Sequence, residues 1–323
     1  LLQQAKTLLM LPDYFGFRLT GNKLSEYTNG STTQLVNPDT FQWDKELIRK
    51  LGYPEDIFLP LQMPRTKVGQ LLPEIQKEVG FDLEVVLCGS HDTASAVMAV
   101  PQTEGDGIYI SSGTWSLMGI ESLKPVITED AAAANFTNEG GYDHRFRFLK
   151  NIMGLWMIQS VRHEYQDAYS FAQLCDMAEE SRDFSSRVDV NDQSFLSPDS
   201  MIEAIKQYCQ KTGQPVPETV GELAAVVYRS LAQSYGETVK ELETIAGRIY
   251  DSIHIIGGGS NAAYLNQLTA DATGKTVYAG PGEATAIGNL LAQMIHAGDL
   301  ADLKGARQCV RDSFEIKTYV PAD

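Results

Sequence analysis

Three short apolar segments of this chain each end at glycine or small polar residues. Each is followed directly by a residue pattern that predicts a turn or a helix. Residues 84–89, mostly apolar, predict a short buried strand that leads into residues 90–100, whose small side chains predict a helix. Residues 108–119 alternate apolar and polar side chains on both sides of Gly113, which predicts two strands joined by a turn. Residues 252–256 predict a third strand, which runs into a glycine turn and then a helix. Because strands and helices alternate over the last two thirds of the chain, we predict an α/β fold.

The other elements follow from helix boundaries and hydrophobic periodicity. Residues 199–250 are predicted to be helical, and from Val220 the apolar positions recur for about 30 residues, enough for a rod of roughly 45 Å. Residues 101–107 are interpreted as a surface link or hinge. Further helices are predicted at 1–11 (with no N-cap before it), 44–51, 73–80, 154–165 and from 282 onward, and strands at 145–149 and 275–278.

Length and composition restrict the class of protein. The chain has 323 residues, of which 43% are hydrophobic and 21% charged, so it is long enough for two domains and is neither disordered nor fibrous. No apolar run approaches the roughly 18 to 20 residues that span a bilayer, so we expect no membrane protein. The first residues have no basic leader and no cleavage site, so we expect no signal peptide there.

Charge and cysteine usage restrict the partners. With 26 basic and 42 acidic residues the net charge is −16, which disfavours nucleic acid as a partner. A small anion remains compatible, but its phosphates would be held by backbone N–H groups, helix ends and a metal. Four dispersed cysteines without a C-x-x-C pair argue against a zinc site and a disulfide scaffold, so we expect a reducing, cytoplasmic location: Cys88, Cys175, Cys209 and Cys309.

The junction at 89–93 places an acidic residue, Asp92, where an apolar strand meets a helix of Ala and Ser. One interpretation is a helix cap, worth about 1 kcal/mol. The other is a general base, because open α/β sheets bind ligands beyond the carboxyl ends of their strands. On this fragment alone the two have even odds. His91 beside it is as compatible with a structural role as with a ligand contact.

The hairpin at 111–116 surrounds Gly113 with hydroxyl side chains. Such a segment is usually just a turn. The alternative is a phosphate clamp, in which the N–H groups of Gly113 and Thr114 and the Thr114 hydroxyl point at an anion. The acidic balance of the chain favours this alternative.

The strand predicted at 252–256 continues into residues 257–262, which satisfy G-x-G-x-x-A, the dinucleotide-binding pattern. The position argues against that interpretation, because only about 60 residues follow and no acidic residue ends the second strand. A glycine turn against which a flat adenine ring can lie fits better. The chain has no G-x-x-x-x-G-K-[ST] and no nucleophile elbow, which excludes a P-loop enzyme and a hydrolase triad of that kind.

Taken together, the three features occur in the order found in one family. The chain resembles the FGGY carbohydrate kinases, relatives of actin, hexokinase and the heat-shock chaperones. Two of the motifs, at 135–141 and 150–154, separate one subfamily from the xylulose, glycerol and fuculose kinases. The segments that carry the resemblance span nearly the whole chain: 19–21, 27–34, 89–97, 109–119, 135–141, 149–156 and 254–261.

The resemblance implies an actin-like, hexokinase-like (ribonuclease H-like) fold and an activity with two substrates. It implies that ATP, with Mg²⁺, phosphorylates the C1 hydroxyl of the ketose L-rhamnulose, and that Asp92 is the catalytic base. By the same similarity, the sugar site comprises His91, Asp92, Thr93 and Asn151. The nucleotide site comprises Gly113, Thr114, Gln159 and Gly257, and by extension Gly258, Gly259 and Asn261. No residue is assigned to the metal.

One departure from the family concerns the beginning of the chain. Family members carry an additional N-terminal stretch with an Asp-x-Gly phosphate loop and part of the sugar pocket. We therefore expect residues 1–100 to be the truncated end of the first, sugar-binding domain and 101–323 to be the complete nucleotide-binding domain. The missing segment would be a partner, and without it activity is in doubt.

Three alternatives remain. The sugar can be fuculose, xylulose or ribulose, since part of the pocket that selects it lies outside the chain. The protein can be an actin-like module that binds nucleotide without catalysis. An NAD-dependent enzyme is the third, and it predicts nicotinamide binding without affinity for ATP.

Overall fold

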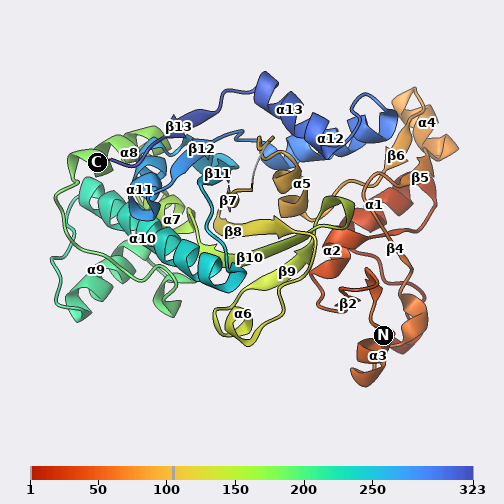
Figure 1. Cartoon of the computed structure of the whole chain (residues 1–323), viewed down its shortest axis with the longest axis horizontal. Coiled ribbons are helices and arrows are strands. Elements are labelled where there is room, and N and C mark those ends of the chain that lie inside the picture. The colour runs from red at the N-terminus through yellow and green to blue at the C-terminus, as the bar shows by residue number, and fades with distance from the viewer. Residues whose placement is uncertain (1, 104–105, 323) are drawn as a thin grey trace.

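The computed structural model describes residues 2–103 and 106–322, and its centre is a seven-stranded mixed sheet (Figure 1). The strand order is β13, β12, β11, β7, β8, β10, β9. β11 (Ser252–Ile256) is parallel to both of its neighbours, β7 (Ile108–Ser112) and β12 (Thr276–Ala279). The remaining pairs are antiparallel and add β8 (Trp115–Ser122), β10 (Phe146–Met153), β9 (Thr137–Gly140) and β13 (Lys317–Tyr319). The predicted α/β class is confirmed.

Helices cover both faces of this sheet, because alternate strand residues are apolar on each face. Ile110 of β7 points into one core and Tyr109 into the other. The first core lies under α7 (Trp156–Glu164), α8 (Phe171–Glu180), α9 (Met201–Lys211), α10 (Val220–Ala246) and α11 (Ala263–Thr273). The second lies under α5 (Asp92–Met98), α12 (Ala284–Ala297) and α13 (Leu303–Ser313). A short helix, α6 (Glu129–Ala133), stands between β8 and β9.

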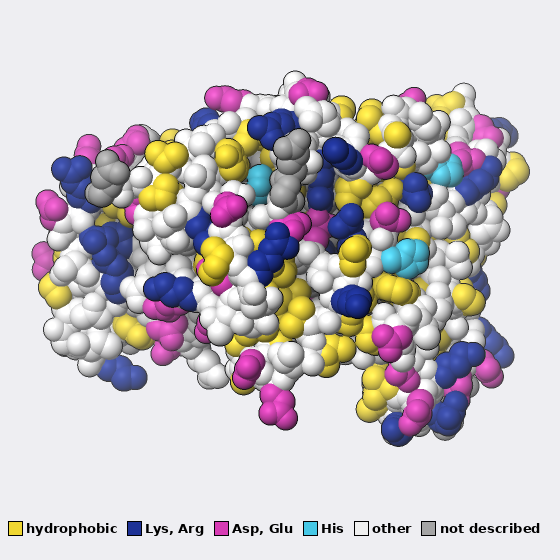
Figure 2. Space-filling model, in the orientation of Figure 1, with side chains coloured by type: hydrophobic (Ala, Val, Ile, Leu, Met, Phe, Trp, Pro, Cys, Tyr) yellow, Lys and Arg dark blue, Asp and Glu magenta, His cyan; other side chains and the backbone are white. Residues whose placement is uncertain are grey.

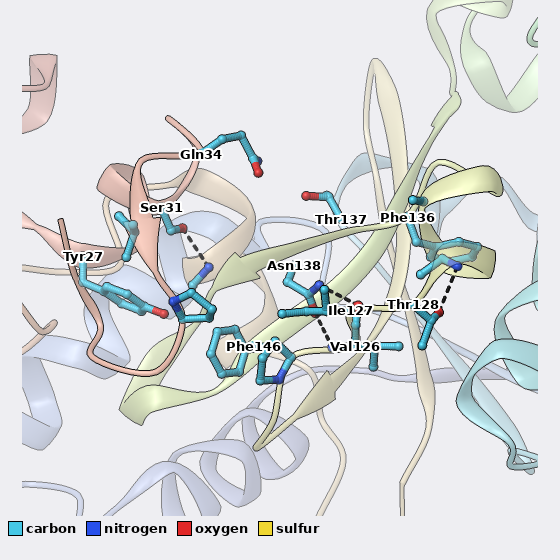
Figure 3. A pocket seen from close by; sticks show the side chains of 16 residues that line it. Tyr27, Ser31, Gln34, Val126, Ile127, Thr128, Phe136, Thr137, Asn138 and Phe146 are labelled. Atoms are coloured by element: carbon cyan, nitrogen blue, oxygen red, sulfur yellow. Dashed lines mark hydrogen bonds between the residues drawn. The ribbon is translucent and has the colours of Figure 1, made fainter. Parts of the chain in front are cut away.

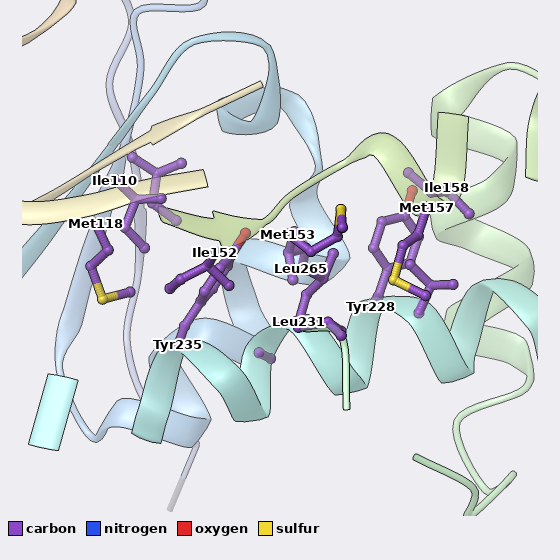
Figure 4. Close-up of a cluster of buried hydrophobic side chains, with 14 of the residues drawn as sticks. Ile110, Met118, Ile152, Met153, Met157, Ile158, Tyr228, Leu231, Tyr235 and Leu265 are labelled. Atoms are coloured by element: carbon purple, nitrogen blue, oxygen red, sulfur yellow. The ribbon is translucent and has the colours of Figure 1, made fainter. Parts of the chain in front are cut away.

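The long helix α10 is the main support of the first core. It begins at a capping box between Thr219 and Glu222 and ends at Gly247 in the left-handed conformation. Its 27 residues correspond to about 40 Å, close to the prediction. Figure 4 shows Tyr235 of this helix beside Ile152 of β10, and Tyr228 beside Met157 and Ile158 of α7.

Residues 2–90, which precede α5, form short elements beside the large sheet. Their helices are α1 (Leu11–Thr20), α2 (Tyr27–Ser31), α3 (Lys45–Lys50) and α4 (Pro73–Val79). Their strands pair only in twos: β1 (Ser25–Glu26) with β4 (Leu61–Gln62), β2 (Val36–Asn37) with β3 (Gln42–Trp43), and β5 (Lys67–Gln70) with β6 (Glu84–Val86).

Three predicted elements are wrong in detail. No α-helix forms over residues 2–10, where the structure has only a short 3-10 turn at Leu2–Gln4, and α1 begins at Leu11 with Pro12 in its first turn. The helical region predicted over 199–250 is divided into α9 and α10, because residues 212–219 lie outside any helix. The strand predicted at 84–89 is limited to β6, which pairs with β5 and not with the large sheet. Residues 104–105 of the predicted link, and Leu1, lie outside the described residues.

The helices α5 and α12 cross at a point where no side chain fits between them. A Cβ atom placed on Gly288 of α12 would lie 1.8 Å from the backbone oxygen of Ser95 in α5. Ser95 itself is 1% exposed and is flanked by buried Ala94 and Ala96, so its backbone has no room to retreat. The crossing therefore requires glycine on α12.

Replacing this glycine by alanine tests the crossing. We expect Gly288→Ala to lower the free energy of unfolding by about 1–3 kcal/mol or more, since overpacking a tight contact costs that much. Gly305→Ala in α13 is the matched control, because its Cβ would meet only an ordinary contact of 3.6 Å and alanine favours helix. Denaturant unfolding midpoints of the two variants measure the difference. Equal midpoints would contradict the close contact between α12 at Gly288 and α5 at Ser95.

Candidate active site

A cavity of about 710 Å³ opens where α5, the β7–β8 turn, the end of β10 and the segment after β11 meet. Several predicted residues lie on its wall together although they are far apart in the sequence: His91, Asp92, Thr93, Gly113, Thr114, Asn151, Gly257 and Gly258. Glu139, Asn135 and Thr285 line it as well, and the sequence reasoning did not assign them to the site. Gln159, Gly259 and Asn261 are not on the wall.

Asp92 presents its carboxylate to this cavity. It is the first residue of α5, and the N-cap position before it belongs to His91, whose side chain makes no capping bond. The Asp92 side chain is 78% exposed, and its Oδ1 accepts a hydrogen bond of 2.6 Å from the N–H of Thr93. A negative charge is favoured at a helix N-terminus. The carboxylate is thus held in place without being buried in packing.

His91 belongs to a buried charged cluster that the sequence reasoning missed. Its Nδ1 lies 3.2 Å from Nη2 of Arg147, and the same Nη2 lies 3.0 Å from Oε2 of Glu139. The Arg147 side chain is 0% exposed and that of Glu139 is 12% exposed. Burial and, after it, the Arg147 charge lower the pKa of His91. Arg147 lies on the predicted strand at 145–149, where alternation alone gives no sign of a buried charge.

Glu26 anchors the loop that carries His91. Its side chain is fully buried and accepts five hydrogen bonds, two from Thr28, one from Asn29 and two from Ser90. The Thr28 hydroxyl in turn accepts a 3.2 Å bond from the N–H of His91. Burial raises the pKa of Glu26, while the donors around the carboxylate oppose this rise. The start of α5 is thereby fixed to α2.

The hairpin turn is fastened to α7. The N–H of Gly113 donates to the oxygen of Trp115 at 2.9 Å, and the oxygens of Gly113 and Thr114 accept from Leu155 and Trp156. The Gly113 N–H is therefore already used, which differs from the expected clamp. The Thr114 side chain is exposed, and its hydroxyl lies 3.4 Å from Oε1 of Gln159. This contact connects Gln159 to the edge of the cavity.

The glycine turn after β11 packs against the end of β7. A Cβ on Gly257 would lie 2.8 Å from the backbone oxygen of Ser112, and one on Gly259 would lie 2.0 Å from the Ser112 hydroxyl. Gly257 also has a φ of +84°, which side chains rarely adopt. Gly258 is exposed and has open space where its Cβ would be. Asn261 ends this turn, next to the cavity wall at Gly282.

A second cavity, of about 280 Å³, lies between α2 and the β8–β9 segment (Figure 3). Three of its polar side chains form hydrogen bonds within the protein. The Ser31 hydroxyl accepts a hydrogen bond from the N–H of Gly140. The Asn138 amide accepts from the N–H of Val126 and donates to its backbone oxygen, and the Thr128 hydroxyl caps α6.

The described residues also bear on metal binding, disulfides, membrane-spanning helices and surface charge. Among residues 2–103 and 106–322, no group of three or more His, Cys, Asp or Glu side chains is arranged to hold a metal ion. The cysteines at 88, 175, 209 and 309 are free. No described helix has the length and apolar character needed to cross a membrane. Lys and Arg side chains are interspersed with acidic ones over the face in Figure 2.

The chain matches known proteins over nearly its whole length. Residues 1–99 match the N-terminal domain of the FGGY family of carbohydrate kinases, and residues 108–297 match its C-terminal domain. The chain is 53% identical to a rhamnulokinase of Halalkalibacterium halodurans over 99% of this chain and 68% of that protein. It is 48% identical to a rhamnulokinase of Bacillus subtilis over 100% of this chain and 67% of that protein. The chain thus spans about two thirds of these relatives.

Solved structures of low sequence identity share the fold. A ligand-bound xylulose kinase from Lactobacillus acidophilus superposes with a TM-score of 0.72 at 16% identity, over 99% of this chain and 64% of that one. A glycerol kinase from Plasmodium falciparum with ADP superposes with a TM-score of 0.72 at 15% identity, over 95% of this chain and 61% of that one. Together with the family matches, these structures confirm the expected α/β fold of the FGGY carbohydrate kinases.

Proposed function

Because the chain belongs to the FGGY family of carbohydrate kinases, we propose that the protein transfers the γ-phosphoryl group of ATP to the C1 hydroxyl of L-rhamnulose. The names of relatives at 48–53% identity support this sugar. The observation that carries the proposal is the exposed carboxylate of Asp92, which shares one cavity with Thr114 and Gly258.

In the proposed mechanism Asp92 accepts the proton of the C1 hydroxyl as its oxygen attacks the phosphorus. Phosphoryl transfer depends mainly on positioning and on neutralising charge, so one carboxylate within reach of the hydroxyl suffices. His91, Thr93 and Asn151 hold the sugar around it. The nucleotide lies along Gly113 and Thr114, with Gln159 at the edge of the cavity, and across the turn at 257–261.

Magnesium would supply the positive charge that this acidic chain lacks. The described residues offer no cluster of three or more metal-binding side chains, whereas phosphate oxygens are the ligands that Mg²⁺ prefers. We therefore propose that the ion arrives bound to the nucleotide, and assign no protein residue to it.

We propose a domain boundary between residues 100 and 101, supported by the family matches that end at 99 and begin at 108. We also propose that a preceding segment of the same protein packs on the first part. The first part of this chain exposes apolar side chains on α1 and near β6, as expected for a surface that the preceding segment covers. They are Leu11, Tyr14, Phe15, Leu19, Val79, Phe81 and Leu83. The free cysteines fit a cytoplasmic location.

A panel of ketoses tests the proposed activity. In the full-length protein with MgATP, we expect kcat/KM for L-rhamnulose to exceed that for L-fuculose, D-xylulose and L-ribulose by at least about tenfold, since a site that binds particular hydroxyl groups discriminates by that much or more. ADP release measured by a coupled assay gives the rates. A preference for another ketose would favour a different kinase of the family, and ATP binding without sugar-dependent turnover would favour a non-catalytic module.

A further inference from the structure

His91 contacts a buried pair of charged side chains, Arg147 and Glu139, which bears on its protonation. The significance of this for catalysis rests on the proposed function. Arg147 crosses from β10 to the cavity wall with its guanidinium fully enclosed. Its Nε donates to the backbone oxygen of Gly140 at 3.1 Å, and its Nη2 faces both Glu139 and Nδ1 of His91. A charge so deeply buried requires compensation, and Glu139 supplies it.

The guanidinium determines which His91 nitrogen carries the proton. Arginine has only donors, so the 3.2 Å contact requires Nδ1 of His91 to be an acceptor without hydrogen. In an uncharged imidazole the hydrogen then resides on Nε2. Nε2 lies on the ring edge away from Arg147 and is the nitrogen left for the cavity that His91 lines.

The surrounding charges act on the same ring in opposite directions. Glu139 on β9 and Asp92 on α5 each have a carboxylate oxygen 3.9 Å from Nδ1, and both favour a protonated ring. Arg147 on β10 opposes them, as does the burial of a side chain that is only 21% exposed. The net effect lowers the pKa of His91, so the ring is neutral at pH 7.

We propose that Arg147, oriented by Glu139, is a positioning residue that holds His91 as the neutral Nε2–H tautomer. The ring then donates a hydrogen bond to an oxygen of the sugar beside Asp92. A neutral ring also matters for the base itself. A protonated His91 at this distance would stabilise the Asp92 carboxylate and weaken its affinity for the hydroxyl proton.

The tautomer can be measured directly in the unaltered full-length protein without substrate. Nitrogen-15 NMR of labelled histidine distinguishes the two ring nitrogens, and the spectrum of His91→Gln identifies the His91 signals among those of the other histidines. We expect Nε2 to be protonated and Nδ1 to be unprotonated at about pH 7 to 8, above the ordinary histidine pKa of about 6.5. A proton on Nδ1, or a charged ring at pH 7, would overturn the proposal whatever the substrate is.

Variants test the role of Arg147. Arg147→Met removes the positive charge while Glu139 and Asp92 remain, so we expect the His91 pKa to rise. As the pH is lowered, the ring then becomes protonated earlier, and the acidic limb of the activity profile shifts to higher pH. We expect KM for the ketose to increase about tenfold at about pH 8, as for the loss of one hydrogen bond, with a smaller change in kcat. Arg147→Lys keeps a charged donor and should restore part of the difference.

The control removes a comparable buried pair elsewhere. Lys275 is 10% exposed and lies 2.7 Å from Glu243, which is 12% exposed, far along the sheet from His91. Lys275→Met should lower stability but leave the tautomer, the pH profile and KM unchanged. If both methionine variants lower only stability, Arg147 is merely structural and the proposal fails. If Arg147→Met does not fold, the tautomer of the unaltered protein and the Arg147→Lys profile still decide.

Discussion

Asp92→Asn in the full-length protein should lower kcat at least about 100-fold while the affinity for ATP stays the same. General-base assistance typically contributes about 10²–10⁴-fold, and asparagine cannot accept the proton. The exposed side chain makes no packing contribution that the amide would remove, and the amide oxygen can still accept from the N–H of Thr93. Steady-state kinetics with the ketose and a nucleotide-binding titration together measure both quantities.

The control for this variant is an aspartate in the same kind of position. Asp130 is exposed in the first turn of α6, as Asp92 is in α5, but it is not on the cavity wall. Asp130→Asn should leave kcat unchanged. If Asp92→Asn also retains kcat within about threefold, Asp92 contributes only to its helix start, and the proposed chemistry is wrong.

The candidate site was predictable where its residues carry local signals. The turn at 257–259 is recognisable because Gly257 and Gly259 are needed for close approach to Ser112. The hairpin around Gly113 is recognisable because apolar and polar residues alternate on both sides of it. Asp92 stands out because a carboxylate precedes a run of small helical residues. Each of these features depends on a few neighbouring residues, so the sequence alone places them.

The charged groups behind the site could not be predicted in this way. Glu26 and Arg147 are among the residue types that are rarely buried, and only long-range packing encloses them. The pairing of β6 with β5 likewise depends on contacts that periodicity does not encode. Two omitted helices did have signals, since Ser170 and Gln173 form a capping box before α8 and Asp302 caps α13.

The anchoring role of Glu26 leads to the second large effect. Glu26→Ala should lower the free energy of unfolding by about 3 kcal/mol, because it leaves the N–H groups of Thr28, Asn29 and Ser90 without their acceptor. Losing the bond to Ser90 also loosens the segment that holds His91 and Asp92. We therefore expect kcat to fall as well, even at temperatures where the variant is folded.

Chemical denaturation followed by circular dichroism measures the loss of stability, and kinetics well below the melting temperature measure the loss of activity. Glu78→Ala in α4 is the control, since Glu78 is exposed and alanine suits a helix. A variant that unfolds like the control would mean that water replaces the carboxylate at little cost. A variant that is unstable but fully active would mean that the start of α5 is held by α12 and the sheet, and that Glu26 stabilises α2 alone.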